Sequence, residues 1–147
     1  MAGSLAPFLD APHAAGAPPD RPLAAGERWT INDSLRLPGA APARLRGGGR
    51  LVELGVRGGR AVASIRSQTT LLVATISQLR GGRLALTGVE ATDSTATRDV
   101  LDGAVERAGS TTRGTFQVTL ASPSEGGGPV GGTMDLEVTS TTRLLRG

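Results

Sequence analysis

The sequence predicts an all-β protein, a meander of long antiparallel strands that forms a curved sheet or a partly open barrel. Two observations carry this prediction. Apolar and polar residues alternate with period two over long runs, as they do in half-buried strands, and Gly58-Gly59 and Gly81-Gly82 separate such runs, where tight hairpin turns need positive φ. The clearest alternation lies near the end of the chain, in residues 115–120 and 133–139 around a turn rich in proline and glycine.

This last hairpin is expected to gather large apolar side chains on one face. Side chains two residues apart in a strand share a face, and six residues meet that condition in the two segments: Phe116, Val118, Leu120, Met134, Leu136 and Val138. We expect this face to be either core or the wall of a binding groove.

The chain divides into two parts by composition. Residues 1–22 are rich in alanine and proline and show no periodic apolar face, so we expect a disordered arm. Residues 23–147 form the antiparallel β domain. Residues 1–20 lack the basic and apolar regions of a signal peptide, and no segment is long and apolar enough for a transmembrane helix.

Three strands are expected in the first half of the domain. The first begins near Trp29 and ends at Pro38-Gly39, and four of its residues share one parity: Trp29, Ile31, Leu35 and Leu37. The second runs from about Ala43 to Val56, with Val52, Leu54 and Val56 alternating after Gly47-Gly48-Gly49. The third covers residues 60–77 and is rich in β-branched residues.

The next part of the chain is less regular. Residues 83–90 are expected to form a fourth strand. Within residues 92–108 the apolar residues have helical spacing and Thr97 is a possible cap, but Asp102-Gly103 is a strong hairpin signal. We favour the hairpin, followed by a long strand through Leu120.

The segment Pro22-Leu23-Ala24-Ala25-Gly26-Glu27-Arg28-Trp29 resembles the P-x-x-x-G-[DE]-x-W opening of bacterial exported, lipoprotein-type β domains of unknown function. Met134-Asp135-Leu136-Glu137-Val138 is similar to the last strand of those domains, M-x-[LM]-x-[VM]. The resemblance covers residues 22–143. It implies a curved sheet of long strands in the cell envelope or outside the cell, with no catalytic residues to transfer. The lack of a signal peptide in this chain departs from that family.

The residues needed for common catalytic sites are scarce. The chain has no cysteine, which excludes disulfides, thiolate metal sites and cysteine nucleophiles. Its one histidine, His13, lies in the arm, so a Ser-His-Asp triad is not expected. Asp33-Ser34-Leu35 and Asp93-Ser94-Thr95 lack the glycine of aspartic-protease loops. We expect no enzymatic activity and no cofactor.

The densest acidic stretch contains Asp93, Asp99, Asp102 and Glu106. Calcium takes several oxygen ligands from one loop, but this spacing matches no EF-hand loop. Charges near a turn are usually solvated, so we expect no metal site. Glycosidase chemistry needs two acids across a cleft, and the sequence indicates no such pair.

Three Arg-Gly-Gly triplets invite an RNA-binding interpretation: Arg46-Gly47-Gly48, Arg57-Gly58-Gly59 and Arg80-Gly81-Gly82. RNA-binding triplets cluster in disordered tracts, and aromatic residues that could stack on bases are nearly absent here. The net charge is only +3. We interpret the triplets as turns and expect no nucleic acid partner.

Trp29 is the single tryptophan, and its expected role is a core anchor beside the sheet. Long strands lined by small aliphatic residues could leave an apolar concavity. The leading hypothesis is therefore a non-enzymatic, exported or cell-envelope β domain that binds an apolar small molecule, a lipid or a protein partner through Trp29 and the six-residue hairpin face. The alternative is a homo-oligomer that assembles by pairing of edge strands.

Overall fold

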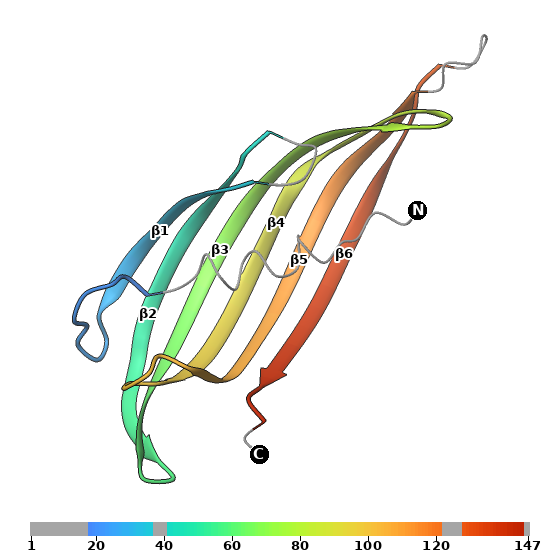
Figure 1. The fold of residues 1–147 in the computed structure, drawn as a ribbon. Helices are drawn as coiled ribbons and strands as arrows, with labels where there is room; N and C mark the ends of the chain where they lie inside the picture. Colours follow the sequence, from blue (N-terminus) through green and yellow to red (C-terminus); the bar gives the residue numbers. More distant parts are fainter. Residues whose placement is uncertain (1–17, 37–40, 122–127, 146–147) are drawn as a thin grey trace.

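A computed structural model describes residues 18–36, 41–121 and 128–145 of the chain. The predicted fold class is confirmed: six antiparallel strands follow one another in a single sheet of order β1-β2-β3-β4-β5-β6, and the sheet does not close into a barrel (Figure 1). The described residues contain no helix. The strands are β1 Arg28–Leu35, β2 Ala43–Arg57, β3 Arg60–Leu79, β4 Gly82–Asp99, β5 Val105–Ala121 and β6 Val130–Arg143.

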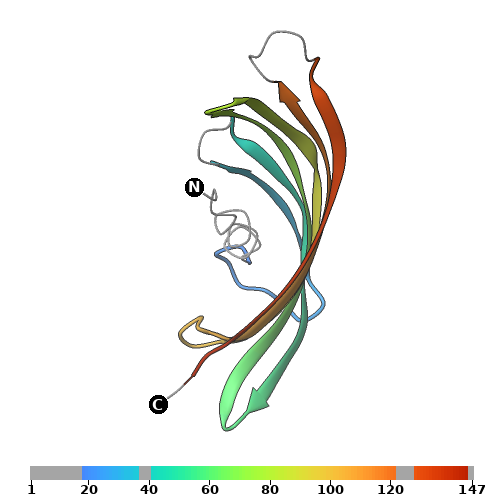
Figure 2. The ribbon, with the colours of Figure 1, turned by 90° about the vertical axis from the view of Figure 1, so that its right-hand side faces the viewer.

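The sheet bends so that one face is concave and the other convex (Figure 2). Twisted long strands coil in this way because each strand twists about its own axis with a fixed hand. The antiparallel register places Leu45 opposite Leu71, Leu71 opposite Glu90, Glu90 opposite Gly114 and Gly114 opposite Leu136. These residues share the concave face. Residues one position away along each strand share the convex face.

The hydrophobic core lies on the concave face. Its buried members are Ile31, Ala43, Leu45, Leu71, Val73 and Phe116, and Trp29, Leu35, Leu86 and Leu136 pack against them half-buried. Burying each large aliphatic side chain contributes about 1.5–3 kcal/mol. The shared parity predicted for Trp29, Ile31 and Leu35 is confirmed. In the described residues, no helix and no second sheet packs on this face.

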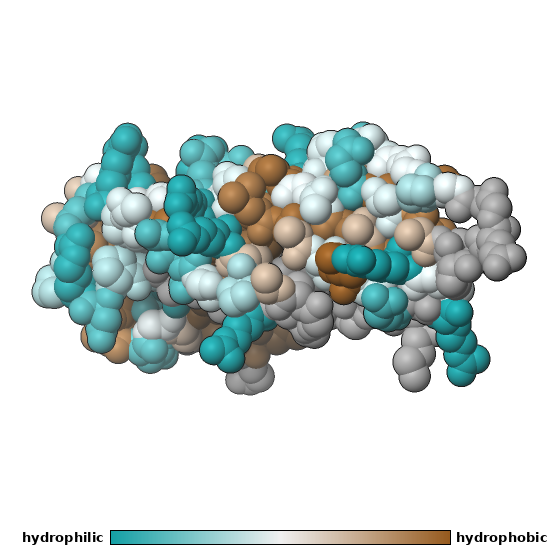
Figure 3. Space-filling model, turned by 90° about the horizontal axis from the view of Figure 1, so that it is seen from above, coloured by the Kyte–Doolittle hydropathy of each residue, from teal (hydrophilic) through white to brown (hydrophobic). Residues whose placement is uncertain are grey.

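Hydrophobic side chains also reach solvent, as separate patches among hydrophilic ones in the view from above (Figure 3). Three of them are the alternating residues of β2: Val52 and Leu54 are each 49% exposed and Val56 is 77% exposed. The register shifts between Leu51 and Glu53, and the β2–β3 hairpin extends beyond the β4–β5 turn and the end of β6 at the bottom of the sheet (Figure 1).

The hairpin predicted at Asp102-Gly103 is confirmed. Gly103 has φ 71°, and β5 begins at Val105. Between β2 and β3, Gly58 and Gly59 have φ 56° and 76°, so the turn predicted there is confirmed as well. Glycine adopts this left-handed conformation without the steric cost that a Cβ would add.

Two sequence predictions about these strands are wrong. The fourth strand does not end at Glu90 but continues to Asp99. The sequence does not indicate this extension, because polar Thr92 and Ser94 occupy the inward positions and no alternation of apolar and polar residues results. The triplet Arg46-Gly47-Gly48 is not a turn but lies inside β2. A Cβ on Gly47 would collide with the backbone oxygen of Gln68, so the close approach of β3 explains a glycine there.

The segment that precedes β1 is held by Glu27. The Glu27 side chain accepts a 2.9 Å hydrogen bond from the Ala24 amide and forms an ion pair with Arg21. The bond from Ala24 and then Arg21 lower the pKa of the Glu27 carboxyl. The backbone of Gly26 donates to Leu51, and Leu51 donates to Glu27. The opening motif thus anchors the chain before the first strand.

Several sequence predictions fall outside the described residues. They concern most of the predicted arm, including His13, and the end of the first predicted strand at Leu37 and Pro38-Gly39. The tip of the last hairpin, residues 122–127, also lies outside them.

Candidate functional site

The candidate site lies on the concave face. We call the part of this face toward the β2–β3 and β4–β5 turns its lower part, and its side chains differ from those of the core. Below the core, the inward positions of β3, β4 and β5 carry hydroxyl side chains. Ser67 lies opposite Ser94 with 2.6 Å between their Oγ atoms, and Thr92 lies opposite Thr112 with 2.8 Å between their Oγ1 atoms. We call the hydroxyl residues of this region the hydroxyl belt: Ser67, Thr69, Thr92, Ser94, Ser110 and Thr112. All but Ser94 are buried.

Glu90 lies at the upper border of the hydroxyl belt, between Leu71 and Gly114 in the register. Its side chain is only 3% exposed. Among the described residues it forms no hydrogen bond and no ion pair. Burial raises the pKa of the Glu90 carboxyl, because removal from water disfavours the charged form.

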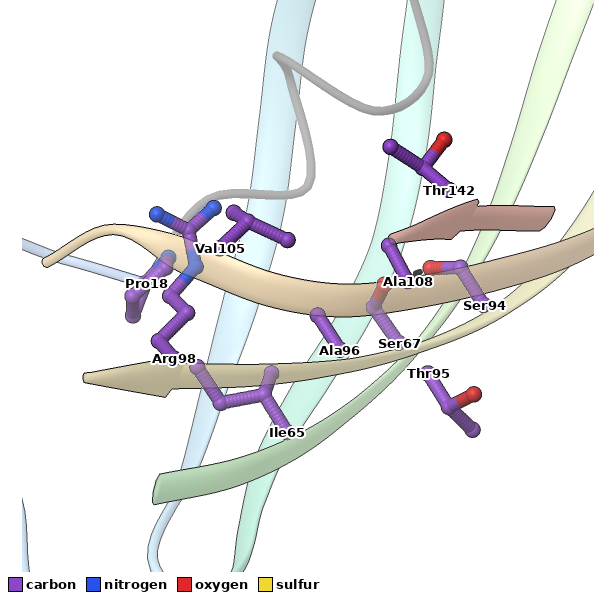
Figure 4. A pocket seen from close by; sticks show the side chains of 10 residues that line it. All are labelled: Pro18, Ile65, Ser67, Ser94, Thr95, Ala96, Arg98, Val105, Ala108 and Thr142. Atoms are coloured by element: carbon purple, nitrogen blue, oxygen red, sulfur yellow. Dashed lines mark hydrogen bonds between the residues drawn. The ribbon is translucent and has the colours of Figure 1, made fainter. Parts of the chain in front are cut away.

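Below the belt, a cavity of about 220 Å³ opens on the concave face (Figure 4). We call it the Pro18 pocket, because Pro18 covers one side of it. Its lining residues are Pro18, Ile65, Ser67, Ser94, Thr95, Ala96, Arg98, Val105, Ala108 and Thr142. Ile65, Ala96 and Ala108 lie opposite one another on three neighbouring strands. Two small alanines beside Ile65 leave the room that larger side chains would fill.

Arg98 is the one charged residue that lines the Pro18 pocket. Its Nη1 donates a long bond of 3.4 Å to the Gly103 carbonyl, while its Nε is buried without a hydrogen-bond partner. An unpaired buried donor costs free energy that a bound acceptor can recover. The pocket therefore combines an apolar wall with one unsatisfied cationic donor.

Most of the residues predicted to bind a ligand lie beside the core on the concave face, whereas Val138 lies opposite Thr112 of the hydroxyl belt. Phe116 lies opposite Met134, and Val118 and Leu120 continue on the same face of β5. Leu136 and Val138 occupy the corresponding positions of β6, so the shared face of the hairpin is observed. Phe116 is buried, whereas Leu120 and Met134 are 41% and 42% exposed. None of the six lines the Pro18 pocket.

Both aromatic residues of the described chain lie on glycines. The Trp29 indole covers Gly49, and the Phe116 ring covers Gly88 and Gly114. Aromatic rings commonly cover strand glycines in this way and shield the exposed backbone. Trp29 Nε1 is buried without a hydrogen-bond partner. This packing agrees with the predicted role of Trp29 as an anchor of the sheet.

The acidic stretch that was considered as a metal site does not converge. Among the described residues, no group of three or more His, Asp or Glu side chains could hold a metal ion. Asp99 instead holds the β4–β5 turn by accepting a 2.8 Å bond from the Leu101 amide, and it lies 3.3 Å from Arg60. Asp93 accepts a 2.7 Å bond from Gln68.

Comparison with known protein families, with curated proteins and with solved structures gave no match. In the described part of the chain, no helix has the length and hydrophobicity needed to cross a membrane.

The sequence predicted an apolar concavity, and the Pro18 pocket lies at residues that the sequence did not single out. Alternation marks Phe116 and Met134, yet Ala96, Arg98 and Ala108 stand out in no sequence pattern. One signal could have indicated them. The Asp102-Gly103 hairpin brings Ala96 and Ala108 close together across two paired strands, and the register shift between Thr97 and Arg98 sets them opposite each other.

Proposed function

We propose that this protein is a non-enzymatic binding domain that holds a small amphipathic ligand, an apolar chain ending in a carboxylate, in the Pro18 pocket. The observation that carries the proposal is the combination of an apolar wall with the buried, unpaired Nε of Arg98. A carboxylate is the natural acceptor for a guanidinium donor. The neighbouring hydroxyls of Ser67 and Ser94 offer further polar contacts at the same wall.

The size of the pocket limits the ligand. Pockets for drug-sized molecules commonly enclose about 300–1,000 Å³, and this one encloses about 220 Å³. A medium-length fatty acid satisfies this size limit, because only its carboxylate head and the first part of its chain need to enter the pocket. The rest of the chain would follow the concave face.

The test uses decanoic acid as the probe and isothermal titration of the whole chain. Ala96→Leu fills the pocket and should weaken binding about tenfold or more, a loss of about 1.4 kcal/mol or more. Ala91→Leu is the matched control, because Ala91 is an exposed residue of the same strand. Decanol should bind more weakly than decanoic acid, because it offers no carboxylate to Arg98.

Two results would reject the proposal. The first is no binding of decanoic acid to the unmodified protein. The second is equal weakening by Ala96→Leu and Ala91→Leu, which would place the ligand elsewhere.

Assembly through edge strands is the second candidate function. β1 and β6 are the two edges of the open sheet, and in an antiparallel meander of six strands they run in opposite directions. β6 of one copy could therefore pair with β1 of the next in the same antiparallel sense. A location outside the cytoplasm is a separate proposal, supported by the resemblance of the opening motif.

A further inference from the structure

A second hollow lies on the opposite, convex face of the sheet, over β1, β2 and β3. It encloses about 520 Å³ and is lined by Arg28, Trp29, Gly48, Gly49, Arg50, Val52, Arg66, Ser67 and Gln68. By strand parity, Arg28, Arg50, Arg66 and Gln68 direct their side chains to this face, whereas Trp29, Gly49 and Ser67 belong to the concave face. The convex-face side chains therefore surround a floor of strand backbone.

Three arginines form a row across this hollow. Arg28 lies opposite Arg50, and Arg50 lies opposite Arg66. Neighbouring strands are about 4.8 Å apart, so three positive charges are held within a short distance. Like charges placed directly opposite each other destabilise a sheet. The row is thus unfavourable for the fold and needs another explanation.

Nearby acids balance only one charge of the row. Among the described residues, neither Arg28 nor Arg50 forms an ion pair. Arg66 lies 3.8 Å from Asp93, whose Oδ1 also accepts a 2.7 Å hydrogen bond from Gln68, so this ion pair is long. An acid elsewhere on the convex face is paired more closely, since Glu137 accepts a 2.9 Å bond from Arg113.

The glycine run of β2 indicates that the hollow is a specific feature. A Cβ on Gly47 would collide with the Gln68 backbone, and one on Gly49 would collide with the Trp29 ring. At Gly48 the nearest atom would be the Trp29 backbone oxygen at 3.4 Å, an ordinary contact. Packing explains the first and third glycines but not Gly48. Its missing side chain is what keeps the hollow open between Thr30 and Gln68.

We propose that this hollow, the Gly48 hollow, is a binding site for a phosphate group. Guanidinium groups match the planar pairs of oxygens that phosphate presents, and they hold their charge at any physiological pH. Phosphate would relieve the repulsion within the row by lying among Arg28, Arg50 and Arg66. The site is on the opposite face from the Pro18 pocket and does not depend on the function proposed there.

The test is a titration of the whole chain with pyrophosphate at low ionic strength, where exposed charges are least screened. Binding should be followed by nuclear magnetic resonance shifts of the β1–β3 amides. Arg50→Ala should weaken binding about tenfold or more. Gly48→Leu should do the same without removing any charge. Arg113→Ala is the matched control, because it removes one positive charge from the same face outside the hollow, and it should leave binding nearly unchanged.

Two arms distinguish the source of the phosphate. Inorganic phosphate tests a free anion, and vesicles of phosphatidic acid, compared with phosphatidylcholine, test a lipid headgroup. Binding in either arm that Arg50→Ala abolishes supports the site. No binding in any arm would overturn the proposal. Equal losses of affinity in Arg50→Ala and Arg113→Ala would also overturn the proposal, because the overall charge alone would then explain the binding. Cooperative thermal unfolding of each variant shows that the fold is intact.

Discussion

Glu90 occupies an environment that opposes its charge. It is buried on the concave face without a described partner, and this burial raises its pKa. The folded state therefore binds the Glu90 proton more tightly than the unfolded state does. The free energy of unfolding contributed by this group is highest below the ordinary carboxyl pKa, and it falls as the pH rises towards the raised pKa.

The variant Glu90→Gln should remove this pH dependence. Glutamine keeps the shape of the side chain and cannot ionise, so the variant should be more stable than the unmodified protein at about pH 7, while the difference should shrink at about pH 4. Urea unfolding at both pH values measures this difference in the free energy of unfolding. Glu106→Gln, in a half-buried position of β5, serves as the comparison. A Glu90→Gln variant that is less stable at neutral pH would mean that the carboxylate has a favourable partner.

Gly47 and Gly48 should respond in opposite ways to the same substitution. Gly47→Ala forces a Cβ against the Gln68 backbone, and such overpacking costs about 1–3 kcal/mol. Gly48→Ala meets only an ordinary contact, and an alanine within a strand is favoured over glycine by about 0.5–1 kcal/mol. Denaturant unfolding of the two variants checks this. Equal effects would show that β3 does not approach β2 as described.

At the scale of elements, Asp99 holds the β4–β5 turn. Its carboxylate accepts a hydrogen bond from the Leu101 amide and lies beside Arg60 at the start of β3. Asp99→Ala removes both interactions and should lower the free energy of unfolding by about 1–3 kcal/mol. Asp102→Ala breaks an exposed bond to the Ala104 amide and should cost less. Thermal unfolding compares them, and a smaller loss in Asp99→Ala would contradict the assigned role.

The strands that the sequence predicted well are those whose local chemistry agrees with their environment. The pair Asp102-Gly103 strongly favours a hairpin turn, and Phe116 and Met134 alternate with polar neighbours. Prediction was wrong where tertiary contacts decide. In β4 the usual pattern of apolar inward and polar outward residues is reversed. Glu90, Thr92 and Ser94 occupy inward positions, whereas the outward neighbour Val89 is apolar and 45% exposed.

The candidate sites were harder to predict for the same reason. The Pro18 pocket combines residues of four strands with Pro18, and no local pattern links Arg98 to Ala108. The arginine row depends on the register of β1, β2 and β3. Three arginines that are far apart in the sequence become neighbours only when that register is known.

The whole molecule is built so that each strand pairs only with its neighbours in the sequence. Such a sheet resembles a linear array in which interior units have two interfaces and terminal units have one. β3 and β4 lie in the middle, and each has a partner along nearly its full length. β1 is an edge of eight residues and β6 an edge of fourteen. Local stability should therefore fall from the centre towards the two edges.

Hydrogen exchange of the backbone amides should show this gradient, because local opening controls exchange in the native state. We expect the slowest exchange in β3 and β4, faster exchange in β2 and β5, and the fastest in β1 and β6. Raising the protein concentration distinguishes the monomer from edge-paired copies, because pairing would slow exchange in β1 and β6 while leaving β3 unchanged. Equal protection of all six strands at low concentration would contradict an open sheet with free edges.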